Sequence, residues 1–399
     1  MGIPVCRSLT RRDFVAQMAV AAGAGVLGCS SSSEPGIDPT PGTLEHIIVV
    51  TMENRSFDHL LGWVPGVDGK QGGLSYPDRG GVMRPTHRLT KFDSCEFSDP
   101  DHSFAGGRVN YNNGACDGWL RPAANDIYAI GYFQGADLPF LGKAAPEWLV
   151  LDRYFCPIMG PTFPNRIISV AGQTDRISNT LVPSTLPTIW DRLAAAGRTG
   201  LNYGTALTTT SLWGARYSSI IKPLSQFISD AAAGSLPNLS FVDPELTGNL
   251  LDSYHPKEEI RNADAFLAKI YQAVTTGPGW NKSLLIVTFD EWGGFFDHVP
   301  PPVAPIPQVE REAGNTDGLR GFRIPTVLIS PFVKRRSVSS KIYDHASVLK
   351  LIETRWNLQP LSVRDTAANN LMDEIDLNIS VTGAPTIDMA PGPYGTRCQ

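Results

Sequence analysis

Carboxylate and amide side chains directly follow two short apolar runs of the chain. Glu53 and Asn54 come after His-Ile-Ile-Val-Val-Thr-Met, and Asp290 and Glu291 come after Leu-Leu-Ile-Val-Thr-Phe. Each run is typical of a buried strand, and in an open parallel sheet the ligand site lies beyond the carboxyl ends of the strands. These carboxylates would repel one another in one pocket unless a positive group lay among them. We therefore predict a divalent cation there: magnesium, calcium, manganese or zinc. The alternative is that Asp290 and Glu291 only cap a helix.

A third polar cluster could supply a nucleophile. The run Met159-Gly-Pro-Thr-Phe-Pro-Asn-Arg166 contains the Gly and Pro residues of a turn that opens a helix. Thr162 would then lie at the helix N-terminus, where backbone amides favour a phosphate oxygen. Coordination to the metal would lower the pKa of its hydroxyl enough for it to attack. Threonine is also common at helix starts for structural reasons, so the local sequence leaves both roles open.

Three histidines in polar loops are candidates for donating a proton to a leaving group. His102 follows Asp99-Pro-Asp101, His255 lies in Asp252-Ser-Tyr-His-Pro256, and His298 follows Asp297. Histidine suits this role because its unperturbed pKa is close to neutral pH. One such histidine is more often structural, but three in one chain favour general acid catalysis.

The elements that must position these residues alternate along the chain. Short apolar runs alternate with helical patterns, which predicts a mainly parallel central sheet with helices on both faces, an α/β fold. The predicted strands are Ile47–Met52, Trp148–Phe155, Leu239–Val242, Ser283–Phe289 and Thr326–Ile329. The predicted helices are Pro187–Ala196, Lys257–Val274 and a helix that Asp344 caps and that runs to about Trp356.

Residues 43–399 are predicted to form a single domain. With 42% apolar and 18% charged residues, the chain can bury a large core. The stretch Val299–Gly318 is rich in proline and acidic residues, and we predict a surface excursion there and not a linker between domains.

The N-terminal residues predict export from the cytoplasm. Arg11 and Arg12 precede the small apolar run Val15–Leu27, which is the layout of a twin-arginine signal. Residues 1–28 end in a sequence similar to a lipoprotein processing box, so Cys29 would be the lipidated first residue of the mature chain. A plain cleaved signal is the alternative. Residues 29–42 are predicted to be a flexible tether. We expect a periplasmic or cell-surface protein that is attached to a membrane through Cys29.

The net charge limits the general partners of the protein, and its cysteines suggest disulfide bonds. The net charge of -5 and the pI of about 5.8 argue against nucleic acid or an anionic membrane surface as a general partner. Cys95, Cys116, Cys156 and Cys398 remain in the mature domain, and disulfides are expected outside the cytoplasm. Cys95 and Cys116 flank a loop rich in Gly and Asn, so we predict that they pair, although four cysteines allow three sets of pairings.

These motifs resemble the phosphoesterase family that contains bacterial phospholipases C and a group of acid phosphatases, related in fold to alkaline phosphatase. The resemblance rests on Glu53-Asn-Arg-Ser-Phe-Asp58, Met159-Gly-Pro-Thr162, Pro164-Asn-Arg166, Thr288-Phe-Asp-Glu291, Gly293-Gly-Phe295 and Asp297-His298. It implies that the metal is held by Glu53, Asn54, Thr162, Asp290 and Glu291, with Thr162 as the nucleophile. It implies that His102 and His255 contact the phosphate and serve the leaving group, and it assigns His298 less directly. The sequence Asp252-Ser-Tyr-His-Pro256 departs from the more usual Asp-Asp-His-Pro-Pro.

The resemblance implies a metal-dependent phosphoric-ester hydrolase with a phospholipid or a small phosphoester as substrate. A threonine at the nucleophile position is typical of relatives that act as phospholipases, whereas the acid phosphatases tend to have serine. We therefore predict a phospholipase C that acts on phospholipid phosphodiesters. An acid phosphatase is the nearer alternative, and a non-catalytic surface lipoprotein of the same fold is the more distant one. The Cys-x-Pro-x-Arg motif of sulfatases is missing, which favours phosphate esters.

Overall fold

The fold is taken from a computed structural model of the whole chain. It describes residues 42–205, 207–246, 252–379, 383–390, 392–395 and 398. The predicted export signal, Cys29 and almost all of the predicted tether lie outside the described residues.

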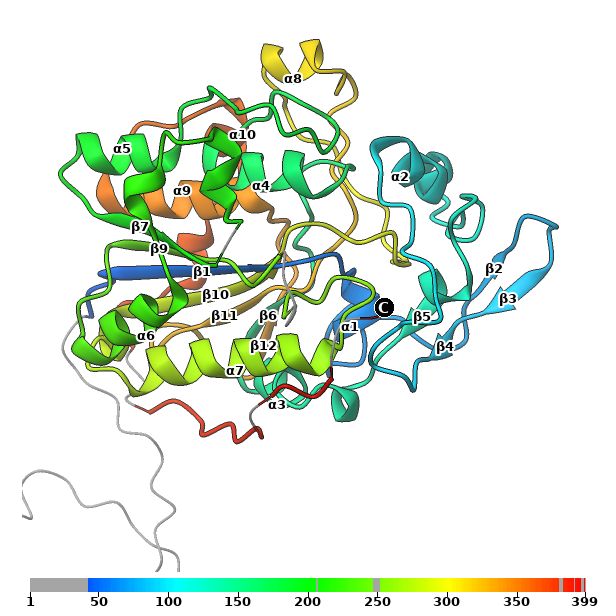
Figure 1. Cartoon of the computed structure of the whole chain (residues 1–399), viewed down its shortest axis with the longest axis horizontal. Helices are drawn as coiled ribbons and strands as arrows, with labels where there is room; N and C mark the ends of the chain where they lie inside the picture. Colours follow the sequence, from blue (N-terminus) through cyan, green and yellow to red (C-terminus); the bar gives the residue numbers. More distant parts are fainter. Residues whose placement is uncertain are drawn as a thin grey trace, which may run out of the picture. The chain divides into compact units, whose positions relative to one another are not determined.

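A mainly parallel sheet of eight strands forms the centre of the described residues (Figure 1). Its strand order is β12-β6-β11-β10-β1-β9-β7-β8. The strands are β1 (His46–Met52), β6 (Leu149–Leu151), β7 (Gly200–Tyr203), β8 (Ile221–Lys222), β9 (Leu239–Val242), β10 (Ser283–Phe289), β11 (Val327–Ile329) and β12 (Ser337–Ser339). All five predicted strands are present. The sequence prediction missed β7, β8 and β12, which are short and carry polar residues.

Strand β11 is the exception to the parallel pattern. It runs antiparallel to both β10 and β6, whereas β1 is parallel to β10 and β9. Strand β1 lies in the middle of the sheet and is almost wholly apolar and buried. A run without alternation is expected for a strand that is covered on both faces.

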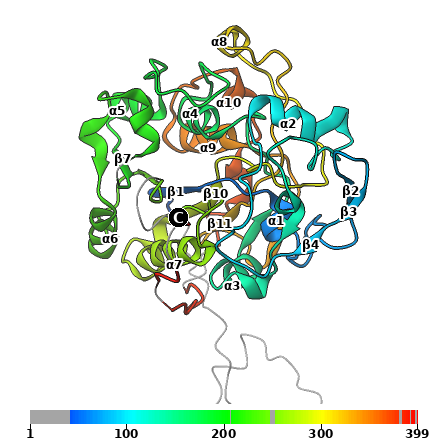
Figure 2. The ribbon, with the colours of Figure 1, turned by 45° about the vertical axis from the view of Figure 1, so that its right-hand side comes forward.

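Helices cover both faces of the sheet, as the two ribbon views agree (Figures 1 and 2). On one face lie α4 (Thr162–Ala171), α5 (Ile189–Ala195), α9 (His345–Trp356) and α10 (Val363–Ala367). On the other lie α3 (Leu141–Ala144), α6 (Leu224–Ala233) and α7 (Ile260–Thr276). The prediction of an α/β fold with helices on both faces is therefore confirmed.

Local chemistry fixes where the predicted helices begin. Helix α7 starts at Ile260 and not at Lys257, because Lys257 has a left-handed backbone with φ of 75° and the Glu259 side chain caps the amide of Arg261. Asp344 caps α9 as predicted. Helix α5 starts after Thr188, whose backbone amide donates to the Asp191 carboxylate in a capping box.

A smaller group of elements flanks one end of the sheet. It contains α1 (Phe57–Leu61), α2 (Phe104–Tyr111), the pair β2 (Ser75–Pro77) and β3 (Met83–Pro85), and the pair β4 (His87–Arg88) and β5 (Gly131–Tyr132). The predicted excursion at residues 299–318 contains α8 (Gln308–Glu312). This excursion is tied to the body, because the buried Glu310 forms an ion pair with Arg364 of α10 at 2.7 Å.

The predicted disulfide between Cys95 and Cys116 is wrong. Cys95 is bonded to Cys398, 303 residues further along the chain, while Cys116 and Cys156 are buried free thiols. Burial raises the pKa of Cys116 to about 12, which keeps it an unreactive thiol. Loop composition could not reveal the true pairing, because it depends on where the folded chain brings its C-terminal residues.

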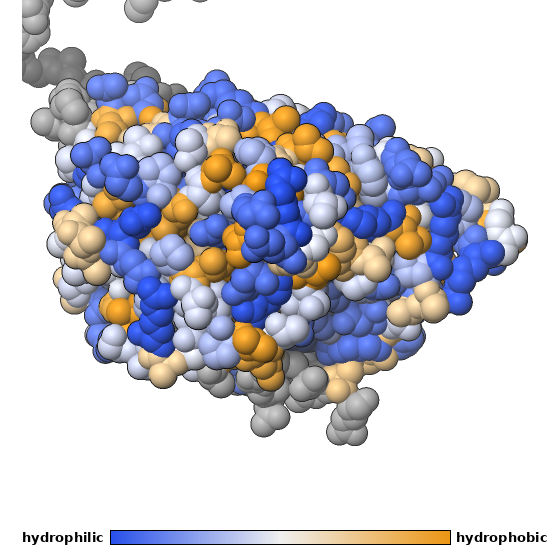
Figure 3. All heavy atoms as spheres, turned by 90° about the horizontal axis from the view of Figure 1, so that it is seen from above, coloured by the Kyte–Doolittle hydropathy of each residue, from blue (hydrophilic) through white to orange (hydrophobic). Residues whose placement is uncertain are grey.

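No helix among the described residues is both long enough and apolar enough to cross a membrane. The face seen in Figure 3 carries small groups of apolar residues scattered among polar ones. Apolar groups of this kind are normal on a protein surface.

Candidate active site

Strand register brings the predicted carboxylates together. Met52 of β1 lies opposite Phe289 of β10, so the next residues, Glu53 and Asp290, leave the sheet side by side. Val50 lies opposite Val242 of β9, which places Asp243 at the same edge. Three parallel strands thus end with three carboxylates at one edge, as expected for the site of an open α/β sheet.

A tight backbone turn holds Asn54 against Asp290 and Glu291. The Asn54 amide donates to Oδ1 of Asp290 at 3.1 Å, and Asn54 has a left-handed φ of 56°. Asparagine tolerates this conformation better than most residues. A Cβ on Gly293 would lie 2.1 Å from the Asn54 carbonyl oxygen, so only glycine fits there. The Gly293 amide in turn donates to Oε2 of Glu291 at 2.7 Å.

Arg166 supplies a positive charge among these carboxylates. Its guanidinium group donates to Asp243 at 2.7 Å, to Asp290 at 3.1 Å and to Glu53 at 3.4 Å, and its side chain is 1% exposed. Burial alone would lower the pKa of Arg166, but the carboxylates outweigh burial and raise it. The sequence prediction named a metal as the positive charge among these carboxylates and did not include Arg166, although Arg166 belongs to one of the quoted motifs.

Thr162 begins α4 and lines a cavity of about 290 Å³. Glu53 and His255 line the same cavity, as do Phe163, Asn179, Leu207, Leu246, Pro256, Lys257 and Glu258. Thr162 and Arg166 are four residues apart on α4, so they lie on the same side of the helix. The contacts of Arg166 with Glu53 and Asp290 therefore fix the end of α4 that carries Thr162.

His102 and His255 lie near each other, with ring centroids 6.4 Å apart. Nδ1 of His102 lies 2.7 Å from the Pro100 carbonyl oxygen, and Nδ1 of His255 lies 2.8 Å from that of Pro256. Each Nδ1–H therefore donates to backbone, which leaves Nε2 available to the site. Nε2 of His102 lies 3.2 Å from the side-chain nitrogen Nδ2 of Asn54.

Electrostatics favour the charged form of His255. Burial lowers the pKa of His255, but the nearby Glu53 and Asp99 carboxylates outweigh burial and raise it above its usual value. An Asp99 oxygen lies 3.7 Å from Nε2 of His255 and another lies 3.9 Å from Nδ1 of His102. Burial also raises the pKa of Glu258, another lining residue, to about 7.

His298 lies in a different cluster from His102 and His255. Its Nδ1 is 2.6 Å from Asp58 and its Nε2 is 3.0 Å from Asp68, so both ring nitrogens have carboxylate partners. Asp58, Asp297 and His298 offer ligand atoms within 4.8 Å of one another, a spacing that a metal ion could use. Arg323 already balances this acidic group, at 2.9 Å from Asp297 and 3.1 Å from Asp58.

The predicted metal ligands fit a hard cation, because two of them, within the described part of the chain, have a buried oxygen atom without a hydrogen-bond partner. Among the described residues, Oδ1 of Asn54 and Oε1 of Glu291 are buried and have no hydrogen-bond partner. A buried oxygen without a partner is costly, and coordination to a cation would remove that cost. Burial raises the pKa of Asp290 to about 6 against the opposing effect of Arg166, and raises that of Glu291 well above its usual value. A divalent cation would displace protons from both.

Arg166 and Asp243 are the residues of this site that sequence analysis did not assign to it. Asp243 follows an apolar strand, in the same way as Glu53 and Asp290, and that pattern could have revealed it. Arg166 lies one helical turn after Thr162, but its direction into the carboxylate cluster depends on how α4 packs on the sheet.

One family model and three known proteins are similar to this chain. The model of the Phosphoesterase family matches residues 44–359. Non-specific phospholipase C6 of Arabidopsis thaliana is 30% identical over 83% of this chain and 72% of its own length. Phospholipase C B of Mycobacterium tuberculosis is 30% identical over 88% and 82%. A solved structure, an alkaline phosphatase superfamily protein from Vibrio parahaemolyticus, is 11% identical over 86% of this chain and 74% of that chain, with a TM-score of 0.40. This last likeness is too distant to inform on activity.

Proposed function

The chain belongs to the Phosphoesterase family and is a phosphoric-ester hydrolase, and from this premise we propose that it is a phospholipase C with Thr162 as its nucleophile. The observation that carries the proposal is the shared cavity, in which Thr162 at the start of α4 faces a space also lined by Glu53 and His255. The relatives at 30% identity are themselves named phospholipases C, which supports a phospholipid diester as the substrate.

In the proposed reaction, Oγ1 of Thr162 attacks phosphorus and the bond to the diacylglycerol oxygen breaks. The departing oxygen takes a proton from Nε2 of His255, whose raised pKa favours the protonated form. The product of this step is a phosphothreonine that still carries the head group. Water then attacks phosphorus while His255 takes one of its protons, and the hydroxyl group stays on the released head-group phosphate. The bond to Oγ1 of Thr162 breaks, and Thr162 regains from solvent the proton that it lost before its attack.

The other residues hold the reacting groups in place. Arg166 fixes α4 against Glu53 and Asp290, and Nε2 of His102 accepts from the side-chain Nδ2 of Asn54. When bound by Glu53, Asn54, Asp290, Glu291 and Thr162, a divalent cation supplies polarisation of the phosphoryl oxygen and favours the ionised threonine hydroxyl. His298 lies in the Asp58–Asp297 cluster, so we assign it a structural role there.

We also propose that the protein is exported by the twin-arginine route and anchored through a lipid on Cys29. This proposal rests on the sequence of residues 1–29. Fractionation of cells that express the wild-type chain or Cys29→Ser tests it: the variant should leave the membrane fraction. A wild-type chain that is found in the soluble fraction would contradict the anchor.

Hydrolysis of p-nitrophenylphosphorylcholine and p-nitrophenyl phosphate tests the activity and the nucleophile together. We expect the diester to be preferred, and Thr162→Ala to lower kcat by about 1,000-fold or more. Thr188→Ala is the matched control, because it also removes a threonine at a helix start, that of α5. Preference for the monoester would make the protein an acid phosphatase, and a fully active Thr162→Ala would exclude the threonine mechanism.

A further inference from the structure

Residues 92–102, here called the strap, contain His102 and lie against the loop that carries His255. His102 lies at the end of the strap, and the strap residue Asp99 faces both His102 and His255 at 3.9 and 3.7 Å. The other end of the strap lies against the start of α7, where the Ile260 amide donates to the Phe92 carbonyl at 3.0 Å. The distance between the two imidazoles therefore depends on how the strap is held against the loop that carries His255.

Lys257, two residues after His255, binds the strap through its backbone and its side chain. Its amide donates to Oγ of Ser94 at 2.9 Å, and its ammonium group donates to the carbonyl oxygens of Phe97 and Cys95. Lys257 thus makes three hydrogen bonds, each to a different residue of the strap.

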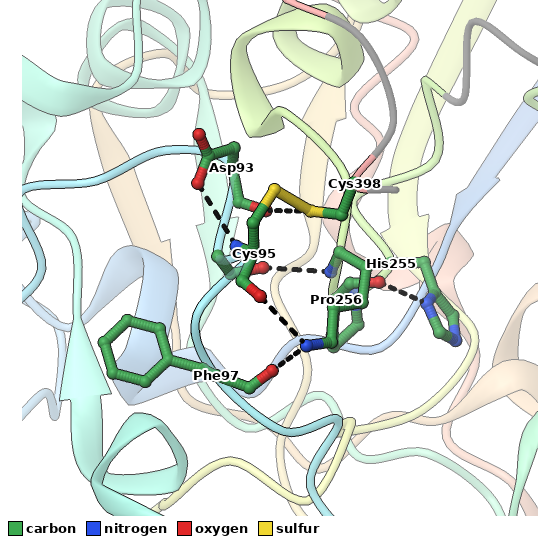
Figure 4. The surroundings of a disulfide bond; sticks show 8 residues. Asp93, Cys95, Phe97, His255, Pro256 and Cys398 are labelled. Carbon is green, nitrogen blue, oxygen red and sulfur yellow. Dashed lines mark hydrogen bonds between the residues drawn. A yellow bond between two sulfur atoms is a disulfide. The ribbon is translucent and has the colours of Figure 1, made fainter.

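The Cys95–Cys398 disulfide also holds the strap near the loop that carries His255 (Figure 4). Cys95 of the strap is bonded to Cys398, and the Cys398 amide donates to the Lys257 carbonyl oxygen at 3.4 Å. Cys398 is thus joined covalently to the strap and by a hydrogen bond to the His255 loop. Cys95 is exposed, so a reductant can reach the bond.

The His255 loop needs such support because of its backbone. Tyr254 and Lys257, on either side of the His255-Pro256 pair, have φ of 76° and 75°, a region that residues other than glycine rarely adopt. Residues in such conformations persist only where the surroundings hold them in place. The Tyr254 carbonyl is held by Arg55 at 2.7 Å, and Lys257 is held by the strap and Cys398.

We propose that Lys257 and the Cys95–Cys398 disulfide position His255 relative to His102, so that turnover depends on the oxidised disulfide. The inference rests on the proposed role of His255 as the proton donor. Lys257 does not touch the reacting atoms in this scheme; it acts through the placement of the imidazole. Oxidation outside the cytoplasm would then complete the site, and reduction would loosen it.

Steady-state kinetics on dispersed phosphatidylcholine, whose alkoxide leaving group needs a proton, test the inference with the full chain. We expect reduction, confirmed by mass, to lower kcat by about 10-fold to 100-fold with little change in KM, since small misplacements of a reacting group cost this much. Cys95→Ser with Cys398→Ser should match the reduced wild type and no longer respond to reductant. Lys257→Met should show a similar loss and Lys257→Arg a smaller one, while Lys269→Met, the same change at an exposed position of α7, should have no effect.

A double-mutant cycle separates positioning from general loss of structure. In a His255→Ala background, Lys257→Met should change kcat by less than about 2-fold, because the group it positions is already gone. An undiminished loss in that background, or full activity of the reduced enzyme, would overturn the inference and leave the proposed function intact. A fully active His255→Ala would instead overturn the role of His255 in the proposed function, and this inference with it.

Discussion

At the scale of single residues, Arg166 determines how the acidic site can be folded at all. Glu53, Asp243 and Asp290 each leave a different strand, and all three lie within 3.4 Å of its guanidinium group. Removing one partner of a buried ionic group leaves uncompensated charge, which is far more costly than losing a surface ion pair. Glu291 is not among the partners of Arg166, so its charge still needs a cation or a proton.

We predict that Arg166→Met lowers the free energy of unfolding by about 3–5 kcal/mol at pH 7 in the presence of a chelator. The loss should be smaller at pH 5, because carboxylates without a partner can take up protons. Urea denaturation at both pH values measures it, and Arg311→Met, at an exposed position of α8, is the control. Equal stability of Arg166→Met and the wild type at pH 7 would contradict this account of the cluster.

Sequence patterns predicted the carboxylates at strand ends better than the residues that reach the site only through tertiary packing. Glu53 and Asp290 could be placed because a strand end fixes where the next side chain emerges. Arg166 and Asp99 could not, because a long side chain or a loop reaches the site only through tertiary packing. The same limit applies to His298, whose local sequence resembles that of a proton donor but whose side chain is held by Asp58 and Asp68.

At the scale of elements, the contact between α9 and α10 contains a buried carboxyl group outside the site. Glu353 of α9 is 5% exposed, and burial followed by the nearby Asp365 raises its pKa to about 9. Asp365 accepts from the amides of Leu361 and Ser362. Glu353 is therefore protonated at neutral pH.

This raised pKa gives stability a definite dependence on pH. The folded state binds the Glu353 proton more tightly than the unfolded state, so its contribution is complete below the unfolded pKa of about 4.5 and is lost as pH rises towards 9. We predict that Glu353→Gln raises the melting temperature at pH 8 and flattens its decline between pH 6 and 9. Thermal scans across that range measure it, with the exposed Glu312→Gln as the control. Identical slopes for Glu353→Gln and the wild type would rule out this assignment.

The segment before α5 exposes two large apolar side chains close to the cavity. Leu181 is 84% exposed and Val182 is 68% exposed, and the nearby Asn179 lines the cavity and accepts from the Phe163 amide. If the substrate is a lipid in a membrane, these side chains are placed to enter its surface beside the site. A water-soluble substrate would gain nothing from them.

We therefore predict that Leu181→Ser with Val182→Ser lowers hydrolysis of phosphatidylcholine in vesicles by about 100-fold, since burying each of the two side chains contributes about 1.5 kcal/mol. Hydrolysis of p-nitrophenylphosphorylcholine should stay the same. Val303→Ser removes a similarly exposed side chain, at 67%, from the excursion and serves as the control. An equal loss on both substrates would exclude a role in lipid contact.

Elements with strong apolar runs were predicted well, and short polar ones were not. Strands β1, β9 and β10 agree with the prediction to within one residue at each end, whereas β7, β8 and β12 were missed because sheet pairing, and not their own sequence, makes them strands. The antiparallel direction of β11 also could not be predicted, because a strand sequence does not encode its direction.

At the scale of the whole molecule, cation binding should couple to global stability. A ligand that binds only the folded state raises the free energy of unfolding by about 2.7 kcal/mol at 100 times its Kd. We predict that at least one of magnesium, calcium, manganese and zinc raises the melting temperature of the chelated protein, and that Glu291→Gln loses most of that increase. Sodium chloride at equal ionic strength and Glu312→Gln are the controls. No response to any of the four cations would contradict the proposed ligand set.

Strand β1 is the first strand of the described residues and lies at the centre of the sheet, so the sheet around it can form only after the later strands have been synthesised. The Asn54 amide and the Asp290 carboxylate that it contacts are 236 residues apart. During synthesis, the ribosome therefore releases β1 long before β9 and β10 are available to flank it. Contacts this distant in sequence form late and slowly. A nascent chain cannot assemble its acidic site until most of its length has been translated, so the cytoplasm that makes this hydrolase is exposed to no active fragment of it.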